Sequence, residues 1–415
     1  MKKRSSLLTA AVICVTSAVP AGVTAAGTSA RFTSSFIQNW YCRDWTAERW
    51  EEEFSAAKSA GFDSLILQST FDIVRGKCMG EKQDPAAYPS AESFCMFPCS
   101  TGTTYLSSQN SGDALELALK AAKATDMQLW LGTVNDDMWW NFGLGAPTSY
   151  FEEWCADNAE LCSGLITEIW ERYGDDYGEQ IAGWYYMNEV WNLNSAGDAS
   201  DCDIYASVIG ANIKASVDAI DRACPEKPLM ISPFYNIQLS DKEQFGSFIS
   251  AVVTAAGFRP YDIYAPQDGG GRNYTPDVIR EWTEAQKKAL NGRMRFWVNN
   301  ECFGPDLTAK PFDEFRRNYA STSDLAEGNI IFSWNHYYAD NTQFKDFSTA
   351  VVKGDADLDG EFTVADLVLF HKWLIGGKDV RLTDWRAADL NGDGRLDAFD
   401  EMLMRRLLFA EKGSA

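Results

Sequence analysis

Short apolar runs alternate with amphipathic segments along most of the chain. The apolar runs predict strands at residues 31–41, 63–68, 128–134, 181–188, 228–233, 261–266, 295–299 and 329–332. The segments between them carry apolar residues at helical spacing and predict helices at 46–60, 113–126, 149–173, 204–222, 240–256, 276–291 and 311–320. Strict alternation implies parallel strands with right-handed crossovers, and eight such strands close a (β/α)8 barrel over residues 31–350. The alternative is an open doubly wound sheet, but no glycine-rich phosphate loop follows the first strand.

Two acidic residues follow apolar runs at the point where each run stops. The run that starts at Ile181 stays apolar and aromatic up to Met187 and is followed by Asn188 and Glu189, and the seventh run is followed by Asn300 and Glu301. Parallel barrels place their chemistry at the carboxyl ends of the strands. Counting strands puts Glu189 after the fourth and Glu301 after the seventh, so we expect the two carboxyl groups to face a common hollow.

A desolvated pair of carboxyl groups fits glycoside hydrolysis, because repulsion keeps one group protonated while the other is ionised. A separation of about 5–5.5 Å would indicate a retaining mechanism, and about 6.5–9.5 Å an inverting one. Other interpretations stay open. Glu189 could be a helix-start acid, Glu301 could be buried against an arginine such as Arg272, and Asp137 or Asp268 could replace one of the pair in an inverting scheme.

The chain holds 15 Trp and 16 Tyr, more than a core of this size needs. Trp139, Trp140 and Trp191 follow predicted strands and are candidate sugar platforms, although each is equally a candidate for the core. Trp184 and Trp297 lie inside predicted strands, where packing is the expected role.

The last 61 residues contain one pattern twice, since Asp389 lies 34 residues after Asp355. Acids or Asn at positions 1, 3 and 5, a Gly at position 6 and oxygen donors at 9 and 12 are typical of a calcium loop. Each loop is followed by an amphipathic helix, at 367–375 and 401–408, so we expect two bound Ca²⁺ ions. The candidate ligands are Asp355, Asp357, Asp359, Glu361, Thr363 and Asp366 in the first loop, and Asp389, Asn391, Asp393, Arg395, Asp397 and Asp400 in the second.

This paired arrangement over residues 354–410 resembles a type I dockerin. The resemblance implies binding to a cohesin domain of a scaffold protein, and hence a place in a cellulosome-type complex. It also implies that the contacts come from Val364, Ala365, His371, Lys372, Ala398, Phe399, Arg405 and Arg406. The two sets of residues differ in type, so the repeats are not assumed to be interchangeable.

The barrel resembles the retaining clan A glycoside hydrolases over residues 31–350. The resemblance implies that Glu189 is the acid/base, that Glu301 is the nucleophile, and that Asn188 contacts a sugar hydroxyl. It places a sugar-stacking Trp at Trp334. The run Ala265–Gly269 is similar to a marker of a poorly characterised family in this clan. Other candidate substrate-binding residues at strand ends are Gln267, Asp268 and Tyr235.

Two departures from the clan pattern concern pKa tuning and substrate choice. His336 is the only histidine of the barrel, and Gln267-Asp268 stands where an aromatic hydroxyl often supports the nucleophile.

The first residues have the pattern of a secretion signal. Basic residues at positions 2–4 precede an apolar segment from Leu7 to about Val19, and small residues near 24–26 suit cleavage, so we expect residues 1–26 to be removed and the protein to be extracellular. No other run approaches ~20 apolar residues, so membrane insertion after cleavage is not expected. The net charge of −22 argues against a nucleic-acid partner.

Ten cysteines fit an oxidising compartment. Cys14 leaves with the signal, and the remaining odd number predicts a free thiol, for which Cys302 is the candidate. We expect Cys78 to pair with Cys95 or Cys99, and Cys202 with Cys224, which flank one predicted helix, are candidates for a further bridge. Metal binding by cysteine is disfavoured, because no pair has CxxC spacing.

Taken together, the sequence predicts a secreted retaining glycoside hydrolase that acts on a polysaccharide, with calcium only in the dockerin-like module and no cofactor in the barrel. The alternative is a non-catalytic carbohydrate-binding barrel anchored to a scaffold. The sequence leaves the sugar, the linkage and endo or exo action open.

Overall fold

The computed structural model describes residues 31–349 except 77–79, 81 and 91, and residues 353–412 except 358–361, 378–379, 381, 383–384 and 392–394. The expected signal segment 1–26, Cys14, Cys78, Asp359, Glu361 and Asp393 lie outside the described residues. No helix in the described part of the chain is long and apolar enough to cross a membrane.

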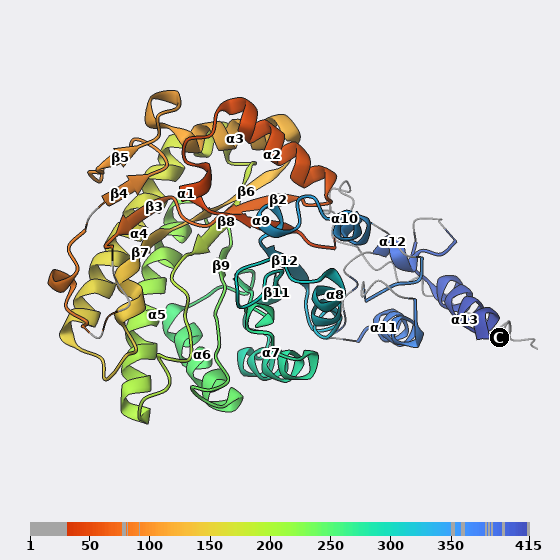
Figure 1. Ribbon diagram of the computed structural model, residues 1–415. Helices are drawn as coiled ribbons and strands as arrows, with labels where there is room; N and C mark the ends of the chain where they lie inside the picture. The colour runs from red at the N-terminus through yellow and green to blue at the C-terminus, as the bar shows by residue number, and fades with distance from the viewer. Residues whose placement is uncertain are drawn as a thin grey trace, which may run out of the picture.

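Eight parallel strands close a barrel at the centre of the molecule, which confirms the predicted fold class (Figure 1). The fourth barrel strand is β8, and β11 and β12 are the seventh and eighth; β12 pairs with β1 to close the ring. The strands in chain order are β1 (Ser34–Ile37), β2 (Ser64–Leu67), β6 (Gln128–Gly132), β8 (Ile181–Tyr186), β9 (Leu229–Ile231), β10 (Ile263–Tyr264), β11 (Arg295–Glu301) and β12 (Gly328–Phe332).

A helix follows every barrel strand and covers the outside of the ring (Figure 1). Local sequence sets several helix starts: the side chains of Thr46, Asp113, Asp198, Asp241 and Thr275 each accept a backbone N–H of the first turn. The helices are α2 (Ala47–Ser59), α3 (Ala114–Thr125), α4 (Ser149–Tyr177), α5 (Ala199–Ala223), α6 (Lys242–Ala256), α7 (Pro276–Leu290), α8 (Phe312–Ala320) and α10 (Thr342–Thr349), with short turns α1 (Asn39–Cys42) and α9 (Trp334–Tyr337).

The long segment after β2 differs from its prediction. The segment between residues 69 and 112, expected as a loop, contains β3 (Phe71–Val74), β4 (Glu92–Cys95) and β5 (Tyr105–Leu106), with short 3-10 turns η1 (Pro85–Ala87) and η2 (Asn110–Gly112). These strands join β7 (Val134–Asp136) in a second sheet of order β5-β4-β3-β7, at the edge of the barrel (Figure 1). The first strand is also shorter than expected, because α1 begins at Asn39.

The barrel is filled by large side chains rather than by a channel. Ring contacts between Phe36 and Tyr185 and between Trp130 and Trp297 cross its interior, as is usual for a packed barrel core. Trp184 and Trp297 are both buried, as expected for strand residues.

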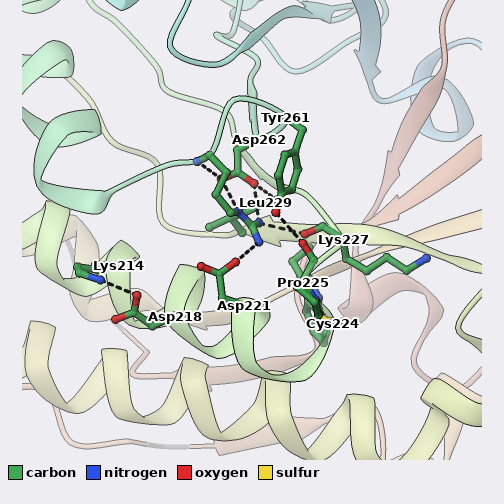
Figure 2. A network of polar contacts seen from close by, with 11 residues as sticks. Lys214, Asp218, Asp221, Cys224, Pro225, Lys227, Leu229, Tyr261 and Asp262 are labelled. Atoms are coloured by element: carbon green, nitrogen blue, oxygen red, sulfur yellow. Dashed lines mark hydrogen bonds and ion pairs between the residues drawn. The ribbon is translucent and has the colours of Figure 1, made fainter. Parts of the chain in front are cut away.

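At the amino ends of the strands, a polar network joins two neighbouring loops and the end of α5 (Figure 2). The buried carboxylate of Asp262 accepts the N–H of Leu229 at 2.7 Å and two guanidinium bonds from Arg259. Arg259 also donates to Asp221 on α5 and to the carbonyl of Lys227. This network ties the start of β9 to the start of β10 and to the end of α5.

The cysteines correct one expectation and confirm another. Cys302 is a buried free thiol, as predicted. Cys202, Cys224, Cys95 and Cys99 are also free, so the Cys202–Cys224 bridge is wrong. The predicted pairing of Cys78 lies outside the described residues.

A small helical module follows the barrel, with its own core around Phe370, Ala388 and Met404. Its helices are α11 (Val364–Leu374), α12 (Trp385–Ala388) and α13 (Ala398–Lys412), at the right of Figure 1. Leu369 and Val380 of the module line a groove with barrel loops that precede β10, β11 and β12. The module therefore lies at the amino-end face of the barrel.

Candidate active site

A cavity of about 430 Å³ lies at the carboxyl ends of the barrel strands. Its position follows from two lining residues: Glu301 is the last residue of β11, and Phe332 is the last residue of β12. The lining residues are Gln68, Trp140, Tyr185, Glu189, Trp191, Phe234, Gln267, Gly271, Arg272, Asn299, Glu301, Phe303, Pro305, Leu307 and Phe332.

Glu189 and Glu301 both line this cavity. Burial raises the pKa of Glu189 to about 7; a hydrogen bond from Gln267 acts against the shift, and the charge of Glu301 adds to it. Glu189 follows β8 by three residues, and its backbone carbonyl accepts the indole N–H of Trp139 at 2.9 Å. The carboxyl group therefore stands in a position where it keeps its proton close to neutral pH.

Glu301 is held more tightly than Glu189. Its Oε2 accepts the N–H of Gly271 at 2.8 Å, from the 3-10 turn η4 (Gly270–Arg272) that follows β10. Burial raises the pKa of Glu301, whereas the Gly271 N–H and the charges of Lys310 and Arg272 lower it. Among the described residues, Glu189 has only the hydrogen bond from Gln267 to favour its ionised form, whereas Glu301 has this backbone donor and these cations.

A third carboxyl group lies directly behind Glu301. The Oδ1 of Asp268 accepts the N–H of Gly270 at 2.7 Å and that of Glu301 at 3.3 Å. Burial, and then the charge of Glu301, raises the pKa of Asp268 to about 8. Asp268 is 1% exposed and is not among the lining residues, so the structure places it as a support of Glu301 rather than in contact with the cavity.

The other predicted substrate-binding residues divide into two groups. Trp140, Trp191 and Gln267 line the cavity. Asn188, Tyr235, Trp139 and Trp334 are buried outside the lining.

Each residue of the second group has a contact elsewhere. Asn188 donates to Asn158 and to the hydroxyl of Tyr186. Tyr235 donates to the carbonyl of Asp268 and stacks on Trp282. The ring of Trp334 packs against Phe62.

Sequence reasoning missed several lining residues that strand ends could have indicated. Gln68 directly follows β2, Asn299 lies near the end of β11, and Phe332 ends β12. Buried Lys310 had no such signal: it lies beyond the turn after β11, and its ammonium group donates to Asn273 at 2.8 Å. Asp137 lies outside the lining, with its carboxylate accepting the N–H of Arg75.

The first calcium loop brings three acids together. Ligand oxygens of Asp355, Asp357 and Asp366 all lie within 4.8 Å of one another. The carboxylate of Asp366 accepts the N–H of Asp357 and that of Thr363, whose side chain caps α11. Oxygen donors converging on one point fit the preference of Ca²⁺ for carboxylate ligands.

The second loop repeats this hydrogen bonding 34 residues later. The carboxylate of Asp400 accepts the N–H of Asn391 and the N–H of Asp397. The side chain of Asp397 accepts the N–H of Phe399, just as the side chain of Thr363 accepts the N–H of Ala365 in the first loop. The remaining described candidates, Asp389 and Arg395, belong to the same loop. The described parts of the two loops therefore share one pattern of hydrogen bonds.

Two family matches cover nearly all of the described chain. Residues 32–345 match "Domain of unknown function (DUF4434)". The chain belongs to the DUF4434 family. Residues 353–409 match the "Dockerin type I domain", so the C-terminal module is a type I dockerin, as its loops predicted. No curated protein matches the chain.

Solved structures similar to the DUF4434 barrel include sugar-cleaving enzymes. A "putative alpha-L-fucosidase" from Bacteroides thetaiotaomicron VPI-5482 is 16% identical with a TM-score of 0.56, over 79% of this chain and 97% of that one. An endo-1,4-beta-mannanase from Rhizomucor miehei is 14% identical with a TM-score of 0.50, over 77% of this chain and 93% of that one. At this identity the likeness shows the barrel fold alone.

The predicted docking residues of the dockerin are all exposed. They lie at the start of each helix and on its outer side: Val364, Ala365, His371 and Lys372 on α11, and Ala398, Phe399, Arg405 and Arg406 on α13. Glu401 joins the two helices, because it pairs with His371 of α11 and with Arg405 of its own helix. A type I dockerin implies calcium binding and a cohesin partner.

Proposed function

We propose that this DUF4434 protein is a retaining glycoside hydrolase that cleaves O-glycosidic bonds in a polysaccharide. The observation that carries the proposal is the pair Glu189 and Glu301, lining one cavity at the carboxyl ends of β8 and β11. Two carboxyl groups with unequal environments supply the acid and the nucleophile that glycoside cleavage needs.

In the first step, the carboxylate of Glu301 attacks the anomeric carbon while Glu189 gives its proton to the departing glycosidic oxygen. The bond to the leaving sugar breaks, and a glycosyl ester forms on Glu301. In the second step, Glu189 removes a proton from water, which attacks the anomeric carbon and frees Glu301. Two displacements at one carbon return the original anomeric configuration.

The aromatic wall of the cavity suits a sugar ring. Trp140, Trp191 and Phe234 lie in a row, with ring centroids 6.3 Å apart for Trp140 and Trp191 and 5.6 Å for Trp191 and Phe234. Sugar rings stack on such surfaces through their C–H faces. The dockerin would hold the enzyme on a cohesin-bearing scaffold outside the cell, after removal of residues 1–26 as a signal peptide.

The test is turnover of an aryl glycoside panel and a polysaccharide panel by three proteins: the unmodified chain, Glu189→Gln and Glu301→Gln. Both variants should lose at least 10³-fold in kcat/KM on the polysaccharides and on aryl glycosides whose leaving group needs a proton. Sodium azide should restore turnover to Glu301→Gly and yield a glycosyl azide of inverted anomeric configuration. Glu281→Gln, an exposed charge change on α7, serves as the control with full activity.

Full activity of Glu301→Gln would contradict the assignment of the nucleophile. A product of inverted configuration, seen by NMR at early times, would contradict the retaining mechanism. Sugar binding without any released reducing ends would favour the non-catalytic carbohydrate-binding barrel instead.

A further inference from the structure

The cavity holds one cation among its described lining residues, Arg272. The other charged lining residues are Glu189 and Glu301. Arg272 belongs to η4, the same turn whose Gly271 N–H holds Glu301. Arg272 is therefore the next residue along the chain after the one whose N–H contacts the proposed nucleophile.

The turn and an aromatic ring restrict where this guanidinium can go. Gly269 and Asn273 flank η4 with left-handed φ of +81° and +57°, and the N–H of Arg272 donates to the carbonyl of Gly269 at 3.0 Å. The guanidinium carbon lies 5.0 Å from the centre of the Phe234 ring. A stacked arginine keeps its planar fork of donors oriented, here along the wall that Phe234 and Trp191 form.

No described carboxylate is paired with Arg272, although the chain has 59 acidic and 37 basic residues. Other arginines near acids are paired: Arg75 with Asp136 and Arg259 with Asp262. The charge of Arg272 helps to lower the pKa of Glu301, but Glu301 has closer partners in the Gly271 N–H and a second cation in buried Lys310. Arg272 is left with donors that face the cavity and solvent.

We propose that Arg272 binds a carboxylate on the substrate, so that the preferred glycan carries a uronic acid next to the bond that is cleaved. The inference rests on the proposed function only in taking the cavity as the sugar site. A guanidinium fork matches a carboxylate with two parallel hydrogen bonds, which are stronger than bonds to a neutral hydroxyl. The ring wall beside the fork accommodates the sugar that bears the carboxylate.

The charge of the cavity allows such a ligand. Burial keeps the proton on Glu189 close to neutral pH, and Asp268 behind Glu301 is also protonated there. An incoming carboxylate near Arg272 then meets one anion, Glu301, whose pKa the charges of Lys310 and Arg272 both lower.

The test measures binding rather than turnover, with Glu189→Gln as the background. The probes are acidic oligosaccharides from glucuronoxylan, pectate and alginate, each beside its counterpart in which the carboxyl groups are reduced to alcohols. At least one acidic probe should bind tenfold or more tightly than its reduced form. The preference should disappear in Glu189→Gln/Arg272→Gln and weaken in 0.5 M NaCl.

The matched control is Arg317→Gln, the same charge change at an exposed position on α8, which should leave the preference unchanged. Equal affinity for acidic and reduced probes, or a preference that survives Arg272→Gln, would overturn the inference. Binding confined to a sulfated probe such as carrageenan oligosaccharide would also overturn it. Acid-dependent binding without hydrolysis by the unmodified protein would leave this inference standing and remove the proposed hydrolase.

Discussion

Glu189 should set the alkaline limit of activity. Its pKa is raised to about 7 by burial, so the proton that it must give to the leaving group is lost as pH rises through about 7. We expect kcat/KM for an ordinary glycoside to fall above that pH. A dinitrophenyl glycoside, whose leaving group needs no proton, should show no such fall. A pH profile with the same alkaline limb for both substrates would show that the limb belongs to another group.

Asp268 should make the barrel less stable as pH rises. Its pKa is about 8 in the fold and near 3.9 in an unfolded chain. Between these values the folded state binds more protons, so the free energy of unfolding falls with rising pH. Asp268→Asn removes this loss. At pH 9 its free energy of unfolding, measured in urea, should exceed that of the unmodified protein by about 1–3 kcal/mol.

At pH 4, where Asp268 is neutral in the fold, Asp268→Asn should show no such gain. Asp277→Asn, at an exposed position on α7, gives the same charge change without burial and should show no such pH dependence. An equal stability difference at pH 4 and pH 9 would contradict the role assigned to Asp268.

At the scale of elements, apolar periodicity was sufficient to predict every barrel strand and the helices between them. Long periodic segments such as 204–222 were found because a buried stripe repeats every turn, although the helix α5 starts five residues earlier. The ends of the strands were harder to predict. β11 runs on through polar Asn299 and Asn300 to Glu301, because the side chain of Asn299 donates to Ser232 and that of Asn300 donates to Asn329.

The small sheet β5-β4-β3-β7 was not predicted. Its strands have two to four residues each, too short for an alternating pattern to stand out. What identifies them is pairing across the chain, such as Phe71 with Cys95 and with Val134. The same limit applies to the site, because Arg272 reaches the cavity and Lys310 reaches Asn273 through turns whose shape no local pattern encodes.

The network at the amino ends of β9 and β10 should contribute strongly to stability. Arg259→Met would leave the buried carboxylate of Asp262 without its partner and the carbonyl of Lys227 without a donor (Figure 2). We expect a loss of about 3 kcal/mol in urea unfolding, with unchanged turnover. Lys214→Met breaks the exposed pair with Asp218 in the same view and should cost less than about 0.5 kcal/mol. Similar losses for the two variants would contradict this ranking.

At the scale of the whole molecule, the two functional ends are opposite. The cavity lies at the carboxyl ends of the strands, and the dockerin adjoins loops at their amino ends. A scaffold bound to the dockerin would therefore leave the cavity open to a polymer. The chain has a net charge of −22. The positive charge of Arg272 in the cavity therefore stands out against its surroundings more than it would on a basic protein.

A buried ion pair connects the barrel to the first calcium loop. The guanidinium of Arg31, three residues before β1, lies 3.2 Å from Asp355, and both side chains are at most 1% exposed. The ring of Phe347, in α10, lies 4.0 Å from the guanidinium carbon. Asp355 is also one of the three acids whose oxygens lie within 4.8 Å of one another, and we predict that it is the first calcium ligand of its loop. Ordering of the loop by calcium should therefore reach the barrel through Arg31.

Calcium should therefore raise the unfolding temperature of the barrel as well as that of the dockerin. In calorimetry of the full chain, 5 mM CaCl₂ against EDTA should shift the barrel transition upward by about 3 °C or more, since a ligand that binds only the folded state stabilises it. In Arg31→Met, the dockerin should still respond while the barrel transition no longer does, because the pair that transmits the effect is gone. An equal barrel shift in Arg31→Met and the unmodified chain would show that the two domains are coupled elsewhere. A calcium-insensitive barrel in the unmodified chain would show that they unfold independently, in spite of the buried pair.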